Sequence, residues 1–179
     1  GDGIPEVYIQ NSVFNGQTGV RLVNGGNGSF GFHFRSNSLG QISVPTAGDF
    51  IPGGNLELAA GNTVYQVEIT NTAGEAGNLM TPIVLAGYPD GSTAVADVDG
   101  DGLLDVVVAH TNNSNQVYVW NPRTAAIIAE VPDAFTRGGI AFIGDLDGDG
   151  PVEIGFTVAN EVRTYKYDGT TTLNLFWSL

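Results

Sequence analysis

Two short loops carry the residues best suited to chemistry. In each, acids occupy the first, third, fifth and ninth positions and glycine the sixth, beginning at Asp97 and Asp145. Carboxylates at this spacing point into a tightly curved loop, and the glycine permits the sharp turn. A backbone carbonyl at position seven would complete an oxygen cage. The predicted metal ligands are Asp97, Asp99, Asp101, the Leu103 carbonyl and Asp105 in one loop, and Asp145, Asp147, Asp149, the Pro151 carbonyl and Glu153 in the other.

An all-oxygen cage predicts which metal it would hold. Flexible coordination by six to seven oxygens suits Ca²⁺ better than Mg²⁺, which prefers to keep its waters. Neither loop contains histidine or cysteine, so metals that prefer nitrogen or sulfur are disfavoured. Four acids in one loop repel each other unless a cation neutralises them. The alternative interpretation is that each loop is a solvated acidic turn without a metal. Two copies of the loop at equivalent positions disfavour this alternative. An EF-hand needs an acid at position twelve, where Val108 and Phe156 stand.

The two loops belong to an internal repeat, since Asp97 and Asp145 lie 48 residues apart. The same interval before Asp97 leads to Asp49, whose loop ends at Glu57. This copy lacks the acids at positions three and five, so we expect it to bind no metal.

The first residues of the chain match the later positions of the same motif. Asp2, the Ile4 carbonyl and Glu6 would form part of a third calcium site. We therefore expect the chain to be a piece of a longer protein. The expected repeats are residues 1–48, 49–96, 97–144 and 145–179.

Each repeat predicts four strands with the acidic loop after the first. The last copy has expected strands at 139–144, 152–158, 161–167 and 172–178, and the third at 92–96, 104–110, 116–120 and 126–131. The run from Leu103 to Ala109 is apolar on both faces, as expected where sheets stack.

A four-stranded unit of this length is typical of a β-propeller blade. We therefore predict an all-β fold of antiparallel four-stranded blades, with residues 1–179 as one propeller segment. The chain holds about 3.7 blades, whereas closed propellers have roughly 4–8. Either the partial ends complete a four-bladed ring, or this segment belongs to a larger one; we favour the larger ring.

Composition excludes several functions. The chain has 19 acidic and 6 basic residues, so too few cations exist to replace the counterions of a nucleic acid or to bind an anionic membrane. It has no cysteine, which excludes disulfides and thiolate chemistry. No apolar stretch approaches the roughly 18 residues of a membrane span.

No catalytic group stands out. His33 lies in an alternating strand and His110 at a strand end, and neither accompanies a nucleophile motif. Paired acids for glycoside hydrolysis are possible in principle, but the obvious acids are assigned to calcium. Several aromatic residues either stack on sugars or, as we favour, pack between blades. These are Tyr118, Trp120, Tyr165, Tyr167 and Trp177.

The acidic loop between two strands resembles the FG-GAP/VCBS repeat family, which occurs in integrin α-subunit propellers and many bacterial surface proteins. Asp97 opens a complete motif, and Asp145 opens one that ends in Glu153. Residues 141–144 (Ala-Phe-Ile-Gly) approximate the phenylalanine–glycine part. The resemblance implies a seven- or eight-bladed propeller, Ca²⁺ on the blade loops, and binding to other macromolecules.

The leading hypothesis is a calcium-stabilised binding, adhesion or scaffold module, without catalytic activity, of a secreted or cell-surface bacterial protein. Its partners would be a protein or glycan and the remaining blades of the same parent protein. One alternative is the propeller part of a secreted polysaccharide lyase or glycoside hydrolase. Another is a cargo or subunit fragment of a bacterial secretion or surface assembly.

Overall fold

The computed structural model describes residues 3–34, 41–110, 116–132 and 139–179. These residues form an all-β fold of seventeen strands without a helix. Accordingly, no helix in the described part of the chain could span a membrane. Four sheets follow one another in sequence, and a two-stranded hairpin lies between the first and second.

Each sheet is formed by strands that are consecutive in sequence and pair antiparallel. The first sheet contains β1 (Glu6–Ile9), β2 (Ser12–Asn15) and β3 (Arg21–Asn24). The second contains β6 (Thr46–Gly48), β7 (Glu57–Ala60), β8 (Thr63–Glu68) and β9 (Leu79–Val84). The third contains β10 (Ser92–Ala96), β11 (Asp105–His110), β12 (Gln116–Asn121) and β13 (Ala126–Glu130). The fourth contains β14 (Phe142–Gly144), β15 (Glu153–Val158), β16 (Glu161–Tyr167) and β17 (Leu173–Ser178). The hairpin contains β4 (Phe32–Phe34) and β5 (Gln41–Ser43).

These sheets confirm the predicted propeller-like blades. The strands of the third and fourth sheets lie where the sequence pattern places them, with small differences at their ends. Among the described residues of the other repeats, the hairpin β4–β5 has no counterpart. His33 lies in β4, as predicted for an alternating strand.

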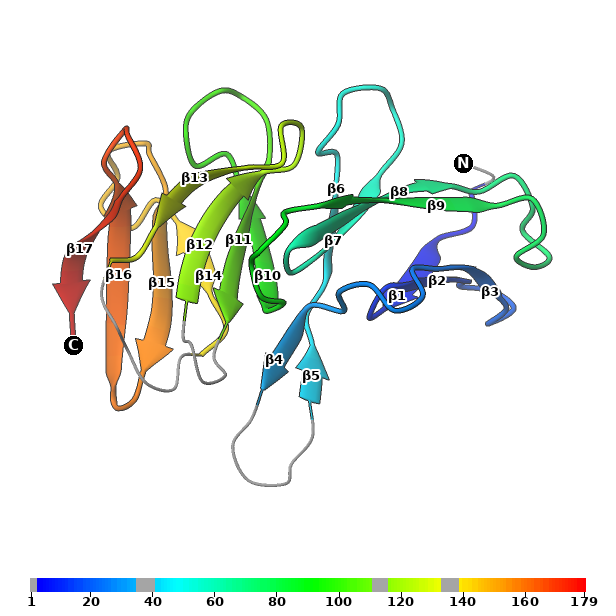
Figure 1. Ribbon diagram of the computed structural model, residues 1–179, viewed down its shortest axis with the longest axis horizontal. Helices are drawn as coiled ribbons and strands as arrows, with labels where there is room; N and C mark the ends of the chain where they lie inside the picture. Colours follow the sequence, from blue (N-terminus) through cyan, green and yellow to red (C-terminus); the bar gives the residue numbers. More distant parts are fainter. Residues whose placement is uncertain (1–2, 35–40, 111–115, 133–138) are drawn as a thin grey trace.

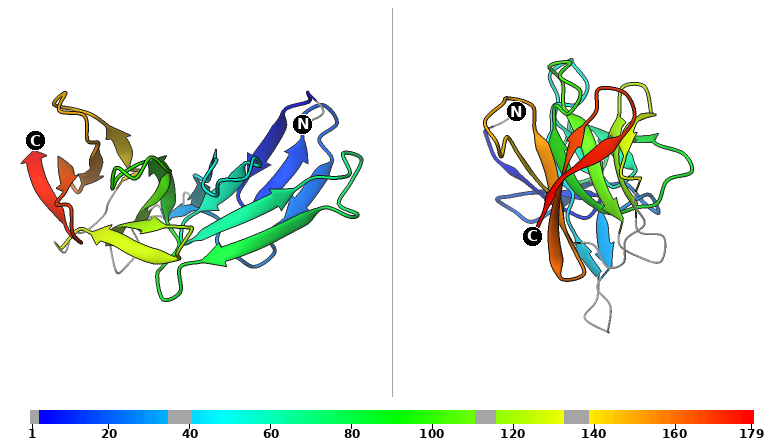
Figure 2. Two further views of the ribbon diagram at one scale, coloured as in Figure 1. Left: turned by 90° about the horizontal axis from the view of Figure 1, so that it is seen from above. Right: turned by 90° about the vertical axis from the view of Figure 1, so that its left-hand side faces the viewer.

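The sheets are arranged in a row. Figure 1 shows them one after another along the long axis, with the two termini at opposite ends. Seen from above, the row bends into an open curve (Figure 2, left). An open row of stacked sheets leaves an outer face at each end.

The hydrophobic core lies between neighbouring sheets, and β11 shows why. All six of its residues are buried. Because side chains alternate across a strand, Val106 and Val108 pack with residues of the second sheet, and Val107 and Ala109 pack with the fourth. The prediction that this run is apolar on both faces is therefore confirmed.

Large aromatic side chains fill the core between neighbouring sheets. Tyr118, Trp120 and Tyr165 are fully buried. The Trp120 indole Nε1–H donates to the Gly61 carbonyl oxygen at 3.3 Å, which links the third sheet to the second. These three aromatic residues pack between blades, as we favoured from the sequence.

The acidic loops occupy equivalent corners of their sheets, since each joins the first strand to the second. The residue before the loop pairs with its closing acid: Gly48 with Glu57, Ala96 with Asp105, and Gly144 with Glu153. The three loops are therefore hairpin connections of equal length.

Candidate metal sites

The first aspartate holds the turn of the loop that begins at Asp97. Its two carboxylate oxygens accept backbone hydrogen bonds from Gly100 and Gly102, both at 2.8 Å. Gly102, at the sixth position, has a φ of 85°, a conformation that residues with a Cβ rarely adopt. The sixth position therefore needs glycine, as the motif predicts.

The next two aspartates make short local contacts that set their direction. Asp99 accepts the backbone N–H of Asp101 at 3.1 Å, and Asp101 accepts that of Leu103 at 2.8 Å. Such contacts between a side chain and the backbone two residues on are typical of Asx turns. Asp97, Asp99 and Asp101 each offer one oxygen within 4.8 Å of the others.

The closing acid Asp105 is fully buried at the start of β11. Its Oδ2 accepts the backbone N–H of Val98 at 3.0 Å, which ties the loop to the strand. Burial raises the pKa of this carboxyl to about 6; the charge of Asp99 adds a smaller increase, and the Val98 hydrogen bond opposes it. Burial destabilises the ionised form of this carboxyl, and a cation nearby would stabilise it.

Arg123 supplies one such cation. Its Nη2 lies 2.8 Å from Asp101 Oδ2 and 3.4 Å from Asp105 Oδ1. Its Nη1 also donates to the backbone carbonyls of Leu104 at 3.0 Å and Phe50 at 3.5 Å. Nothing in the sequence motif indicates Arg123, because it follows β12 and reaches the loop only through the fold.

The loop that begins at Asp145 repeats this geometry. Asp145 accepts the backbone N–H groups of Gly148 at 2.6 Å and Gly150 at 3.0 Å. Asp147 accepts that of Asp149 at 3.2 Å. Since Pro151 has no N–H, Asp149 lacks the contact that Leu103 gives to Asp101.

Lys166 forms ion pairs with the acids of this second loop. It lies opposite Glu153 in the β15–β16 pairing. Its Nζ is 2.6 Å from Asp147 Oδ2, 2.7 Å from Asp149 Oδ2 and 3.1 Å from Glu153 Oε1. The hydrogen bond from the ammonium lowers the pKa of Asp147, and the same contacts raise the pKa of Lys166.

Glu153 closes the second loop and is fully buried. Its Oε2 accepts the backbone N–H of Leu146 at 2.6 Å. Its Oε1 is buried without a hydrogen bond and has only the ion-pair contact to Lys166. Asp145, Asp147 and Glu153 each offer one oxygen within 4.8 Å of the others.

These arrangements fit a hard divalent cation. Several carboxylate oxygens converge in each loop, and one buried oxygen in the second loop has an unused acceptor position. Oxygen-only ligation of this kind suits Ca²⁺. The geometry groups three acids in each loop, without Asp105 in the first and Asp149 in the second. Both residues, and the Leu103 and Pro151 carbonyls, stay predictions.

The loop from Asp49 to Glu57 keeps the length and the closing-acid contact of the other two loops but lacks acids at its third and fifth positions. Glu57 is buried, and its Oε2 accepts the backbone N–H groups of Phe50 at 2.8 Å and Ile51 at 3.2 Å. Asp49 is exposed. The predicted partial site at the N-terminus stays a prediction, because Asp2 lies outside the described residues, although Glu6 does begin β1 as its counterparts begin β7, β11 and β15.

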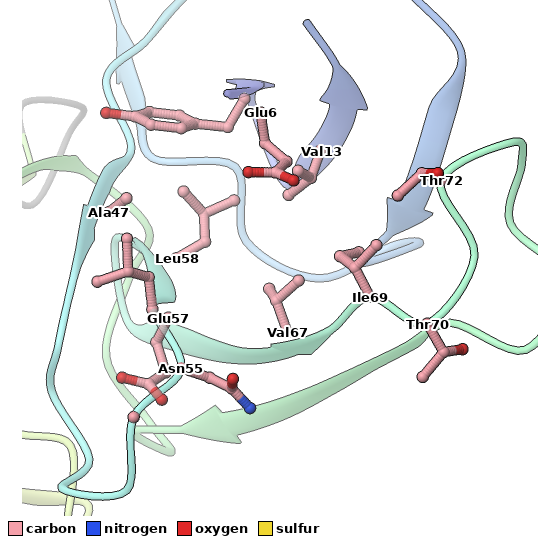
Figure 3. Close-up of a pocket in the computed structure, with 13 residues that line it drawn as sticks. Glu6, Val13, Ala47, Asn55, Glu57, Leu58, Val67, Ile69, Thr70 and Thr72 are labelled. Atoms are coloured by element: carbon pink, nitrogen blue, oxygen red, sulfur yellow. The ribbon is translucent and has the colours of Figure 1, made fainter. Parts of the chain in front are cut away.

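A cavity of about 760 Å³ lies between the first and second sheets (Figure 3). Its walls combine apolar side chains such as Val13, Leu58 and Val67 with the acids Glu6 and Glu57. Glu57 already accepts two backbone hydrogen bonds. Among the described residues that line the cavity, there is no histidine, lysine or arginine.

The comparisons with known proteins agree with this geometry. The family model of the FG-GAP-like repeat matches residues 97–156, a segment that contains both complete acidic loops. No curated protein and no solved structure matches the chain. The chain therefore carries an FG-GAP-like repeat over residues 97–156.

Proposed function

We propose that this chain is a calcium-stabilised, non-catalytic binding or scaffold module of an exported protein. The observation that carries the proposal is the pair of equivalent hairpins, each of which brings three carboxylate oxygens within 4.8 Å of one another. Two copies of this arrangement at the same corner of successive sheets favour a common ligand over two unrelated acidic turns.

Calcium would stabilise the fold, because each loop joins the first strand of its sheet to the second. The proposed ligands are those that the sequence predicts: Asp97, Asp99, Asp101, Asp105 and the Leu103 carbonyl, with Asp145, Asp147, Asp149, Glu153 and the Pro151 carbonyl. The closing acids Asp105 and Glu153 begin the buried strands β11 and β15. A bound ion would neutralise the acids and fix the loop to those strands.

The exposed apolar residues support a larger propeller. Val7 and Ile9 of β1 are 49% and 59% exposed, and Leu175 of β17 is 49% exposed. Such side chains at both ends of a row of sheets suit further blades of the same parent protein. We propose that residues 1–179 are one segment of a seven- or eight-bladed ring.

The chemistry of the loops also suggests where the protein works. Extracellular calcium modules typically bind in roughly the 10⁻⁴–10⁻³ M range, and an oxygen cage on a surface loop fits that class. A secreted or cell-surface location, in a bacterium as the resemblance to repeats of bacterial surface proteins implies, would supply the loops with this calcium. There the module would present its surface to a protein or glycan.

Calcium titration of the whole chain by calorimetry, combined with thermal melting, tests the proposal. We expect two sites that prefer Ca²⁺ to Mg²⁺, and a melting temperature that falls when EDTA removes the ion. The matched pair of variants is Asp97→Asn and Asp145→Asn, each of which should remove one site and leave the other. No heat of binding up to about 10 mM calcium, together with melting that is indifferent to EDTA, would overturn the proposal.

A further inference from the structure

Lys166 makes the second acidic loop different from the first. Its ammonium contacts Asp147, Asp149 and Glu153 at 2.6–3.1 Å. Two of these acids, Asp147 and Glu153, belong to the group of three whose oxygens converge. A calcium ion bound there would need the same oxygens, at roughly 2.3–2.6 Å.

The corresponding position in the first and second sheets carries no charge. Lys166 is the residue that pairs across the strands with the closing acid Glu153. In the second sheet, Gln66 pairs with Glu57, and in the first, Asn15 pairs with Glu6. The hairpin therefore forms with a neutral amide at this position, and the ammonium is specific to the fourth sheet among these three pairs.

Arg123, the cation beside the first loop, is placed differently. It contacts only Asp101 of the group formed by Asp97, Asp99 and Asp101. Its other contacts are the closing acid Asp105 and two backbone carbonyls, which hold the guanidinium at the side of the loop. Calcium could therefore bind the first loop while Arg123 keeps its carbonyl contacts.

From this contrast we infer that Lys166 is a tethered competitor for the cation site of the loop at 145–153. The ammonium neutralises the acids when calcium is scarce, and it must leave them when calcium binds. The second loop therefore binds calcium more weakly than it would with a neutral residue at position 166. This inference rests on the proposed calcium function.

The ammonium has a further partner besides the acids. Its Nζ lies 4.7 Å from the centroid of the Phe176 ring on β17, within the range of a cation–π contact. The Lys166 side chain is 26% exposed, so it can also reach solvent. Calcium can thus displace the ammonium without leaving a buried, unpaired charge.

The experiment uses Asp97→Asn as the background, so that calcium titration reports on the second loop alone. In this background, Lys166→Gln introduces the residue that the second sheet carries at the equivalent position, and Lys166→Arg keeps the positive charge. We expect Lys166→Gln to bind calcium about five- to tenfold more tightly than the background, the size expected for the loss of competing ion pairs. Lys166→Arg should stay close to the background.

Thermal melting supplies a second measurement. In EDTA, Lys166→Gln should melt at a lower temperature than the background, because the acids lose their internal cation. In saturating calcium the two should melt at similar temperatures. If Lys166→Gln binds calcium equally or more weakly while the background binds it, Lys166 is not a competitor and only this inference fails. If neither variant binds calcium, the proposed function fails at this loop.

Discussion

The loop at 49–57 and the loops at 97–105 and 145–153 are anchored to their strands in the same way and differ in charge. All three join equivalent strands in the same register, and in all three the closing acid accepts the backbone N–H of the loop's second residue. The first loop does this with Ile51 and Gly53 where the others carry aspartates. The closing acid is therefore part of the hairpin itself, and the alternating aspartates are not needed to form it. Their cost in repulsion suggests that they serve a cation.

The largest expected effect comes from removing calcium, which should act on the two loops with four acids and leave the loop at 49–57 unaffected. At 10 mM calcium and a dissociation constant of roughly 10⁻⁴–10⁻³ M, each site adds about 1.4–2.7 kcal/mol, so chelation should cost about 3–5 kcal/mol in all. Denaturant unfolding in calcium and in EDTA measures this difference. A variant with both Asp97→Asn and Asp145→Asn is the control and should show no difference.

A comparison of Glu57 with Glu153 separates two roles of the closing acid, the hydrogen bond to the loop backbone and the binding of calcium. Glu57→Ala leaves the buried N–H of Phe50 without an acceptor and should cost about 1–3 kcal/mol, equally in calcium and in EDTA. Glu153→Ala loses the Leu146 contact and the calcium term as well, about 2–5 kcal/mol in calcium. Denaturant unfolding of both variants checks this. A calcium-dependent cost for Glu57→Ala would contradict the distinction.

The first position of the loop gives a smaller contrast. Asp97→Asn keeps one oxygen for the glycine N–H groups but lowers the charge, and it should remove about 1.4–2.7 kcal/mol of calcium stabilisation. Asp49→Asn, at the equivalent exposed position of the loop at 49–57, should change stability by less than about 0.5 kcal/mol. Paired melting curves with and without calcium measure both. Similar losses in the two variants would mean that the first acid acts through the turn alone.

The smallest expected effect concerns pH. The pKa of Asp105 is raised by burial to about 6, above its unfolded value, so without calcium its ionised form destabilises the fold above pH 6 and protonation relieves this as the pH falls. Calcium binds the ionised form of Asp105, so the calcium affinity should decrease as the pH falls. In an Asp145→Asn background, calcium affinity at the first loop should fall about tenfold from pH 7 to pH 5. Calorimetry at the two pH values tests this, and an unchanged affinity would exclude Asp105 as a ligand.

Much of the fold could be predicted because its determinants are local. The acids and glycines of the loops act within nine residues, and the run from Leu103 to Ala109 shows burial on both faces through its composition alone. The hairpin β4–β5 could not be predicted, since it interrupts the repeat and has no second copy for comparison. Arg123 and Lys166 were also missed. Lys166 reaches its loop from the third strand of its sheet and Arg123 from the turn that follows the third strand, so their contacts depend on strand pairing that the motif does not contain.

The burial of β11 on both faces has a mechanical consequence. Since the side chains of this strand complete two separate core layers, neither neighbouring sheet can detach without exposing apolar surface on the third. In such an array each sheet is stabilised by contacts with its immediate neighbours, as in a one-dimensional chain of coupled elements. A stretching force applied at one end should therefore encounter a barrier at each interface between blades, and an ion that stiffens the third sheet would strengthen two of those interfaces at once.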